Sequence, residues 1–115
     1  MTITAFLERL QANPTGITFQ DTIQVVEENY DFTPTAFQNG NHYNKAGENN
    51  GSCKIFAFAK LNNLSKEATL ACFGAYYFKD VLQNPEATDH QNIRNFMQMG
   101  WNGIQFEGEA LVLNH

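Results

Sequence analysis

The sequence contains few charged residues and no long hydrophobic run. Charged side chains make up 17% of the 115 residues and hydrophobic side chains 43%, whereas a disordered chain combines low hydrophobicity with high charge. The longest unbroken apolar runs, such as residues 55–59, are far shorter than the about 18 residues of a membrane-spanning helix. Because one domain has about 100–200 residues, the composition predicts a single compact soluble domain, residues 1–115, with its own core.

Basic residues are also scarce. Seven Lys and Arg stand against twelve Asp and Glu, which gives a formal net charge of −5. A protein that binds nucleic acid normally neutralises phosphates with a basic stripe, so we expect no nucleic-acid partner, and the short apolar runs predict no membrane partner. All Lys residues lie between positions 45 and 79, and solvated Lys on helix surfaces is the simplest interpretation.

Only two cysteines are present, Cys53 and Cys72, and both lie within apolar stretches. A core of this size needs no disulfide, and buried free cysteine is common, so we expect both thiols to be reduced. The first residues carry neither the basic segment nor the long apolar segment of a secretory signal peptide. We therefore expect a cytoplasmic location, or export by a route that removes no signal peptide.

Motifs for metal and nucleotide binding are missing. His42, His90 and His115 have no paired spacing, and there is no Cys-x-x-Cys or His-Glu-x-x-His. The sequence also lacks a phosphate-binding loop motif and a strand-linked Gly-x-Gly-x-x-Gly. The sequence therefore predicts no metal ion and no cofactor.

Apolar residues recur at helical spacing in five segments of the chain. Thr18 and Ser65 are predicted to be N-caps, and Thr88 or Asp89 is predicted to cap the last helix. The segment after Ser65 is apolar nearly all round, so we expect the longest helix there, in the middle of the domain. Gly74 within it lowers helix stability unless another backbone passes close by. The predicted helices are residues 3–10, 19–30, 54–62, 66–83 and a last one that starts after residue 88 or 89.

Strand signals are short. Residues 35–38 precede Asn39-Gly40, a strong turn dipeptide, and the polar residues 41–51 are predicted to form a long loop. Residues 104–107 alternate like a strand, and residues 110–113 could return beside them. The predicted fold class is mainly α (α+β at most), with about five helices and a small C-terminal β-ribbon.

The first candidate site is the junction between the polar loop and the next helix. A cysteine in the first helical turn feels the helix dipole, which lowers the thiol pKa, and a neighbouring Lys acts in the same direction. Cys53 would then be a nucleophile with His90 or His42 as its base, and the junction's amides could hold an anion. The alternative is that Cys53 is a small buried side chain facing the core. The candidate ligand-binding residues here are Glu48, Asn49, Asn50, Ser52 and Lys54.

The second candidate site is the polar start of the last predicted helix, residues 88–95. His90 and Arg94 are four residues apart and are therefore expected on one helix face, with Asn92 and Asn95 as a neighbouring polar stripe. Such a face could bind a small anion or supply a base. Two other interpretations stay open: the residues could cap the helix and face solvent, or form a buried polar network that joins the long loop to this helix.

Three longer segments of the sequence resemble one protein family. They are residues 46–59 (AGENNGSCKIFAFA), 69–77 (TLACFGAYY) and 89–97 (DHQNIRNFM), followed by Gly100-Trp101, Gly103-Ile104 and Phe106-Glu-Gly108. They are similar to the HopJ type III effector family of bacterial proteins, whose members are about this size. The resemblance implies no established activity. The family is named after a protein that plant pathogens deliver by type III secretion, and it also occurs in bacteria without that lifestyle.

The sequence supports three functional hypotheses. The first is a small binding or regulatory domain that contacts an unknown protein or small-molecule partner through loop 41–53 and helix face 90–95. The second is a thiol-dependent enzyme that uses Cys53 and His90. The third is a type III secreted effector that acts on a host protein, although residues 1–51 contain no Ser and export signals are generally flexible and Ser-rich. The first two hypotheses require the two candidate sites to meet in the folded chain.

Overall fold

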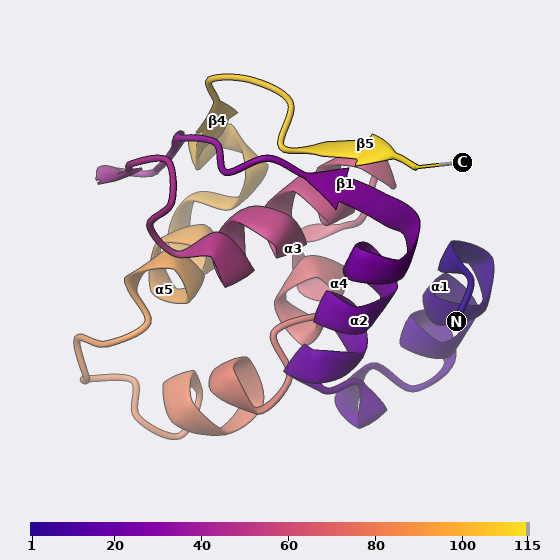
Figure 1. Cartoon of the computed structure of the whole chain (residues 1–115). Helices are drawn as coiled ribbons and strands as arrows, with labels where there is room; N and C mark the ends of the chain where they lie inside the picture. The colour runs from indigo at the N-terminus through magenta and orange to yellow at the C-terminus, as the bar shows by residue number, and fades with distance from the viewer. Residues whose placement is uncertain (115) are drawn as a thin grey trace.

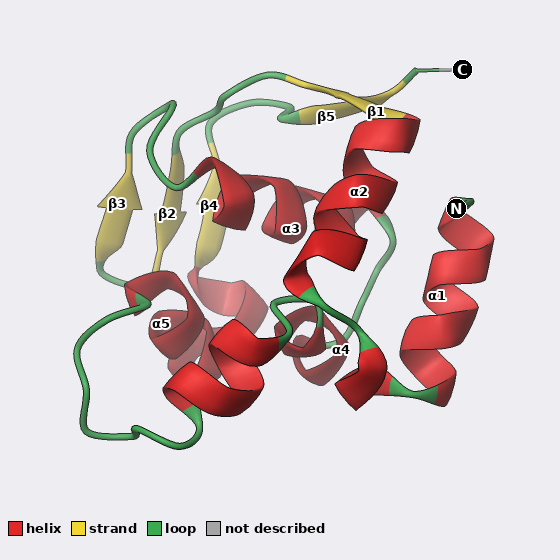
Figure 2. Ribbon diagram, turned by 60° about the horizontal axis from the view of Figure 1, so that its bottom comes forward, coloured by secondary structure: helices red, strands yellow, loops and turns green. Residues whose placement is uncertain are grey.

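The computed structural model describes residues 1–114, and helices make up most of its regular structure (Figures 1 and 2). This confirms the predicted fold class, mainly α with small β elements. The helical elements are α1 (Ile3–Ala12), η1 (Pro14–Gly16), α2 (Phe19–Asn29), α3 (Asn50–Leu61), α4 (Lys66–Ala71), η2 (Tyr76–Val81), α5 (Gln91–Met99) and η3 (Gly100–Gly103). The strands are β1 (Tyr30–Phe32), β2 (Phe37–Asn39), β3 (His42–Asn44), β4 (Ile104–Phe106) and β5 (Leu111–Leu113).

Two of the predicted N-caps are confirmed. The Thr18 hydroxyl accepts a hydrogen bond from Asp21 N at 3.0 Å, and the Asp21 carboxylate accepts one from Thr18 N at 3.0 Å. This reciprocal capping box satisfies amides at the start of α2. Likewise, the Ser65 hydroxyl accepts a hydrogen bond from Ala68 N at 3.1 Å at the start of α4.

Helix α3 occupies the centre of the molecule, with strands along one side and helices on the others (Figure 2). The ring of Phe56 on α3 is fully buried. Its centroid lies 5.0 Å from that of Phe96, 5.4 Å from Phe73 and 5.9 Å from Phe37. Because these rings come from different elements, Phe56 joins three parts of the chain into one core: helix α5, strand β2, and the segment that follows α4. The central helix is therefore α3 and not the predicted helix 66–83.

The predicted helix 66–83 is wrong because it breaks in the middle. Helix α4 ends at Ala71, and the chain resumes at Tyr76 as the π-helical segment η2. Between them Gly74 has φ +60°, and a Cβ there would lie 2.6 Å from the backbone nitrogen of Phe19. The start of α2 thus passes directly against Gly74. Only glycine, which has no Cβ, leaves room for another backbone so close to it.

The strands form two small antiparallel sheets. Strand β2 pairs with β3 and with β4, and β1 pairs with β5. Strand β3 lies within the segment predicted to be loop, and its one amide side chain, that of Asn44, is buried and hydrogen-bonded to Asn92. The two C-terminal strands are present as predicted, but each pairs with an earlier strand and not with the other. The ring of Phe37 stacks on that of Phe106 at 5.2 Å, across the β2–β4 pair.

No helix among the described residues has the length and apolar character needed to cross a membrane.

Candidate functional site

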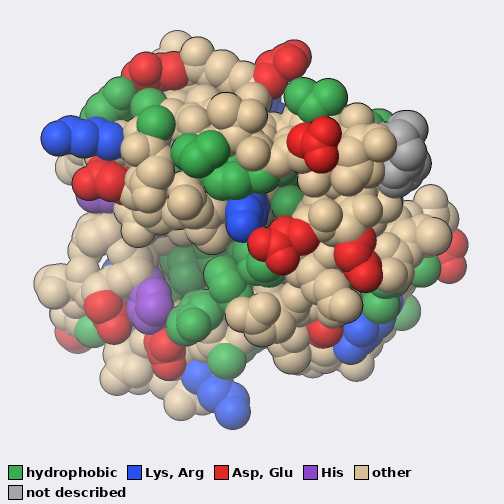
Figure 3. Space-filling model, in the orientation of Figure 1, with side chains coloured by type: hydrophobic (Ala, Val, Ile, Leu, Met, Phe, Trp, Pro, Cys, Tyr) green, Lys and Arg blue, Asp and Glu red, His purple; other side chains and the backbone are tan. Residues whose placement is uncertain are grey.

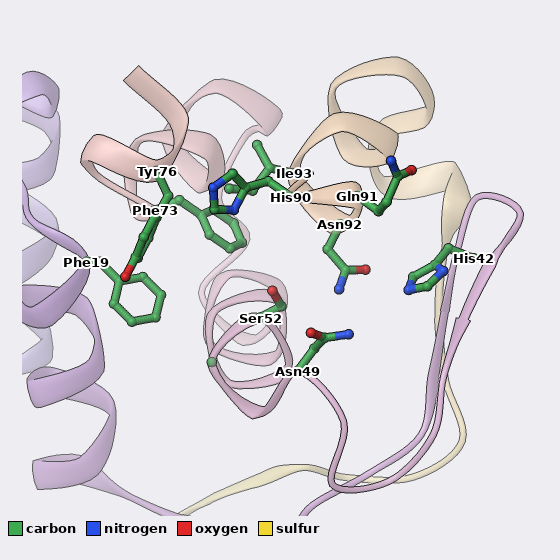
Figure 4. Close-up of a pocket in the computed structure, with 11 residues that line it drawn as sticks. Phe19, His42, Asn49, Ser52, Phe73, Tyr76, His90, Gln91, Asn92 and Ile93 are labelled. Carbon is green, nitrogen blue, oxygen red and sulfur yellow. The ribbon is translucent and has the colours of Figure 1, made fainter. Parts of the chain in front are cut away.

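The starts of α3 and α5 meet around one cavity of about 560 Å³ (Figure 4). The two candidate segments of the sequence are therefore neighbours in the fold. Figure 3 shows a hollow on this face of the molecule, with hydrophobic side chains inside it and a histidine beside it. The residues that line the cavity are Phe19, His42, Asn49, Gly51, Ser52, Phe73, Tyr76, His90, Gln91, Asn92 and Ile93.

Both helices begin at the cavity without a side-chain cap. Asn49 and His90 are the N-cap residues, both have φ 52° and ψ 48°, and neither side chain bonds to its helix. The first helical hydrogen bonds run from Cys53 N to Asn49 O and from Arg94 N to His90 O. The backbone N–H groups of residues 50–52 and 91–93 precede these bonds and have no partner within their helix. The predicted caps Thr88 and Asp89 are therefore wrong, and the carboxylate of Asp89 binds Arg94 instead.

A network of asparagine amides connects the two helix starts to the β2–β3 hairpin. The side-chain oxygen Oδ1 of Asn92 accepts hydrogen bonds from Asn39 Nδ2 at 2.9 Å and from Asn44 Nδ2 at 3.1 Å. In return, Asn92 Nδ2 donates to Asn44 Oδ1 at 2.9 Å. Asn49 Nδ2 donates to Asn44 Oδ1 at 2.7 Å. Asn39 and Asn44 are fully buried. Of the interpretations of Asn92, the buried polar network is the one that the structure shows.

Aromatic rings form another wall of the cavity. The Tyr76 ring lies 5.0 Å from that of Phe19 and 5.3 Å from the imidazole of His90, between centroids. His90 Nε2 lies 3.2 Å from Asp80 Oδ2 and 3.8 Å from Asp89 Oδ2. Asp80 thus holds the imidazole in place beside Tyr76, and the cavity has one flat aromatic wall and one wall of amides.

Arg94 and Asn95 do not join this cavity. Arg94 donates to the backbone oxygen of Asp89 at 2.6 Å and to its carboxylate at 2.8 Å, and this hydrogen bond lowers the pKa of Asp89. Asn95 Nδ2 donates to Asn39 O at 3.1 Å. The expected shared face of His90 and Arg94 is absent, because His90 has a left-handed backbone and lies outside the helix to which the four-residue spacing applies.

Cys53 is buried and faces away from the cavity. Its side chain is 1% exposed, and Sγ lies 3.5 Å from the backbone oxygen of Thr35. Burial raises the pKa of the Cys53 thiol, although the Thr35 hydrogen bond and the charge of Lys54 act in the lowering direction. The expected low thiol pKa is therefore wrong, because desolvation outweighs the helix start. Cys72 is also buried, and its pKa is raised to about 12.

Three other candidate residues lie outside the cavity lining. Glu48 Oε1 accepts a hydrogen bond from Lys45 N at 2.9 Å and so closes the turn before α3. Asn50 is exposed at the first position of α3. Lys54 Nζ lies 3.1 Å from Glu27 Oε2 and so binds α3 to α2. Of the candidate residues, the structure brings Asn49, Ser52, His90 and Asn92 together at the cavity, with His42, the alternative base, beside them.

The aromatic wall and the buried amides were not recognised from the sequence. Phe19 falls in a predicted amphipathic helix and Tyr76 in the predicted helix that is apolar nearly all round, and core packing is the usual role of an aromatic residue in either. A Cβ at Gly51 would lie 2.9 Å from the Phe19 ring, so glycine there lets the ring close against α3. The sequence contains 14 Asn, which is consistent with such a network, but spacing alone does not show that Asn39 and Asn44 turn inward.

The described residues contain no group of three or more His, Cys, Asp or Glu side chains that could hold a metal ion.

Comparison with known proteins gives a family and a solved relative. A crystal structure described as "unknown function protein VPA0580" superposes with a TM-score of 0.98 and is 61% identical in sequence. The match covers 99% of this chain and 95% of that chain. A search of curated proteins found no match. The family described as HopJ type III effector protein matches residues 3–111, and the chain therefore belongs to the HopJ type III effector protein family.

Proposed function

We propose that the chain is a binding domain for a small organic anion, held in the cavity between the starts of α3 and α5. The observation that carries the proposal is that two uncapped helix starts line one cavity of about 560 Å³. Gly51, Ser52, Gln91 and Asn92 belong to these first turns. Their backbone N–H groups and both helix dipoles favour a negative group, such as a carboxylate or a phosphate.

The charges around the cavity are consistent with an anionic ligand. No Asp or Glu is among the residues that line it, and its lining includes two imidazoles, those of His42 and His90. Two carboxylates lie near its α5 side, those of Asp80 and Asp89, which are 3.2 Å and 3.8 Å from His90 Nε2. The ligand's negative group therefore belongs at the α3 side, near Ser52, away from Asp80.

The size and the aromatic wall define the rest of the ligand. Ligand cavities are commonly about 300–1,000 Å³, and this one falls within that range. Phe19, Tyr76 and His90 offer ring faces and edges to an apolar or flat ligand body. We therefore expect a compact anion with one ring, such as an aromatic carboxylate or an aryl phosphate.

Titration with benzoate, phenyl phosphate and inorganic phosphate tests this proposal. In ¹H–¹⁵N spectra of the full chain, phenyl phosphate and benzoate should shift the amides of Gly51 and Gln91. Ser52→Asp puts a fixed negative charge into the first turn of α3, a position where acidic residues stabilise a helix, so it should remove the shifts without unfolding the chain. Thr4→Asp adds the same charge to the first turn of α1, far from the cavity, and should leave the shifts unchanged. Unshifted amides with all three probes, or equal shifts in the Ser52→Asp variant, would reject the proposal.

The cellular location stays a prediction. The family name suggests secretion, whereas the N-terminal segment is ordered: Thr2 caps α1, and the Met1 amine lies 2.9 Å from Glu28. We propose a cytoplasmic location, since a generic export signal is flexible. A reporter fused to residues 1–50 should stay inside cells that carry a working type III system, and its appearance in the medium would favour the effector hypothesis.

A further inference from the structure

The sheet formed by β1 and β5 has an open edge. Thr33 N donates to Ala110 O at 2.8 Å, so residues 33 and 110 form a hydrogen-bonded pair. Hydrogen-bonded and non-hydrogen-bonded pairs alternate along an antiparallel ladder. Val112 therefore bonds toward β1, while Leu111 and Leu113 direct their N–H and C=O groups away from it. Within residues 1–114 no third strand pairs with this sheet.

An apolar groove of about 470 Å³ is lined by the end of α3, the turn before β5, and β5 itself. The side chains of Leu61, Val112 and Leu113 are 55%, 54% and 54% exposed. The groove carries one charge of each sign, Lys60 and Glu109, and neither has an ion-pair partner among the described residues. Leu111 is 5% exposed because its side chain packs in the core, so the exposed part of this strand is Val112 and Leu113. An apolar strand edge without a partner strand is a template for another extended chain.

We propose that this edge pairs with the same edge of a second copy of the chain. The segment Leu111–Leu113 reads the same in both directions, so antiparallel pairing about Val112 places leucine opposite leucine and valine opposite valine. Each copy then offers the other the same surface, as a two-fold contact requires. The product is one antiparallel sheet with the strand order β1-β5-β5-β1.

The charge distribution also favours a second copy at this place. The chain has a formal net charge of −5, so two copies repel each other over most of their surfaces. Strand β5 has no charged residue, and Lys60 and Glu109 balance beside it. This edge is therefore a place where the backbones of two acidic chains can approach within hydrogen-bonding distance.

Sedimentation over a wide concentration range, combined with hydrogen exchange, tests the pairing. We expect the mass to rise from one chain to two. When nine-tenths of the chains are paired, exchange at the Leu111 and Leu113 amides should slow about tenfold, since those amides exchange from the unpaired fraction. Exchange at Val112, whose N–H already bonds to β1, should not change. A chain that stays monomeric at the highest concentration, or equal slowing at all three amides, would overturn the proposal.

A proline variant separates pairing from folding. Leu113→Pro removes an N–H that points to the open edge, and proline is tolerated on edge strands in this orientation. We expect this variant to stay monomeric and to keep the thermal unfolding midpoint of the monomer. Leu113→Ala keeps the N–H and should still pair, more weakly. A dimer that survives Leu113→Pro would show that another surface makes it.

Discussion

Replacing Gly74 with alanine tests the contact between α2 and the break after α4. Gly74 has φ +60°, and an added Cβ would lie 2.6 Å from Phe19 N and 3.1 Å from Thr18 Cα. A left-handed backbone costs a residue with a Cβ about 1–2 kcal/mol. The backbone of α2 cannot rotate away as a side chain can, so overpacking adds about 1–3 kcal/mol. We therefore expect Gly74→Ala to lower the free energy of unfolding by about 2–5 kcal/mol.

Gly47→Ala is the matched control. Gly47 also has positive φ, +92°, but an added Cβ there would have no neighbour within 4 Å. This variant should therefore lose only the conformational contribution, about 1–2 kcal/mol. Urea unfolding of both variants, followed by far-UV circular dichroism, gives the two free energies. Equal losses in the two variants would refute the close contact between Gly74 and α2.

Three further predictions concern the site and its surroundings. Asn92→Ala removes the side-chain amide that Asn39 and Asn44 share, whereas the bonds of Asn39 to the backbone oxygen of residue 92 and of Asn44 to Asn49 remain, so urea unfolding should show a total loss of about 1–3 kcal/mol; a loss below about 0.5 kcal/mol would contradict the network. Cys53 should react with iodoacetamide only when the chain opens, so its native alkylation rate should be far below that of the urea-unfolded chain, and comparable rates would contradict its burial. Because Arg94 lowers the pKa of Asp89, this pair stabilises the fold above the unfolded pKa of about 3.9, and the contribution is lost as the pH falls through the lower folded value. Arg94→Gln should make the fall in stability between about pH 5 and 2 shallower, and an unchanged slope in acid unfolding would contradict the pair.

Local signals in the sequence predicted the beginnings of several elements. Thr18 and Ser65 cap α2 and α4, since each hydroxyl accepts a hydrogen bond from a backbone N–H only three residues later. Such a contact depends on neighbouring residues alone and can therefore be predicted from the sequence. The same local logic failed at residues 66–83, where every side chain suits a helix and Gly74 alone marks the break. What breaks the helix is the backbone of α2, which lies more than 50 positions away along the sequence, and Gly74 is its one local trace.

The sequence predicted the location of the candidate site but not the role of each residue. The amide-rich loop and the segment around His90 are both polar, and they do meet at the cavity. Their individual roles depend on backbone conformation, which composition does not reveal. His90 has a left-handed backbone and lies before α5, and Arg94 bonds to Asp89. The burial of Cys53 outweighs the effect of the helix dipole on the pKa of its thiol.

The pairing of the last strands with early ones affects how the chain acquires its structure. Strand β4 bonds to β2 and β5 bonds to β1, so each sheet joins segments separated by about 65–83 positions. During synthesis the β2–β3 hairpin can form early, but neither sheet can be completed until residues 104–113 have left the ribosome. Contacts between such remote segments slow folding because a large loop must close first. We therefore expect the nascent chain to expose the inner faces of α2 and α3 until these last strands arrive, which is the period when a chaperone would be most needed.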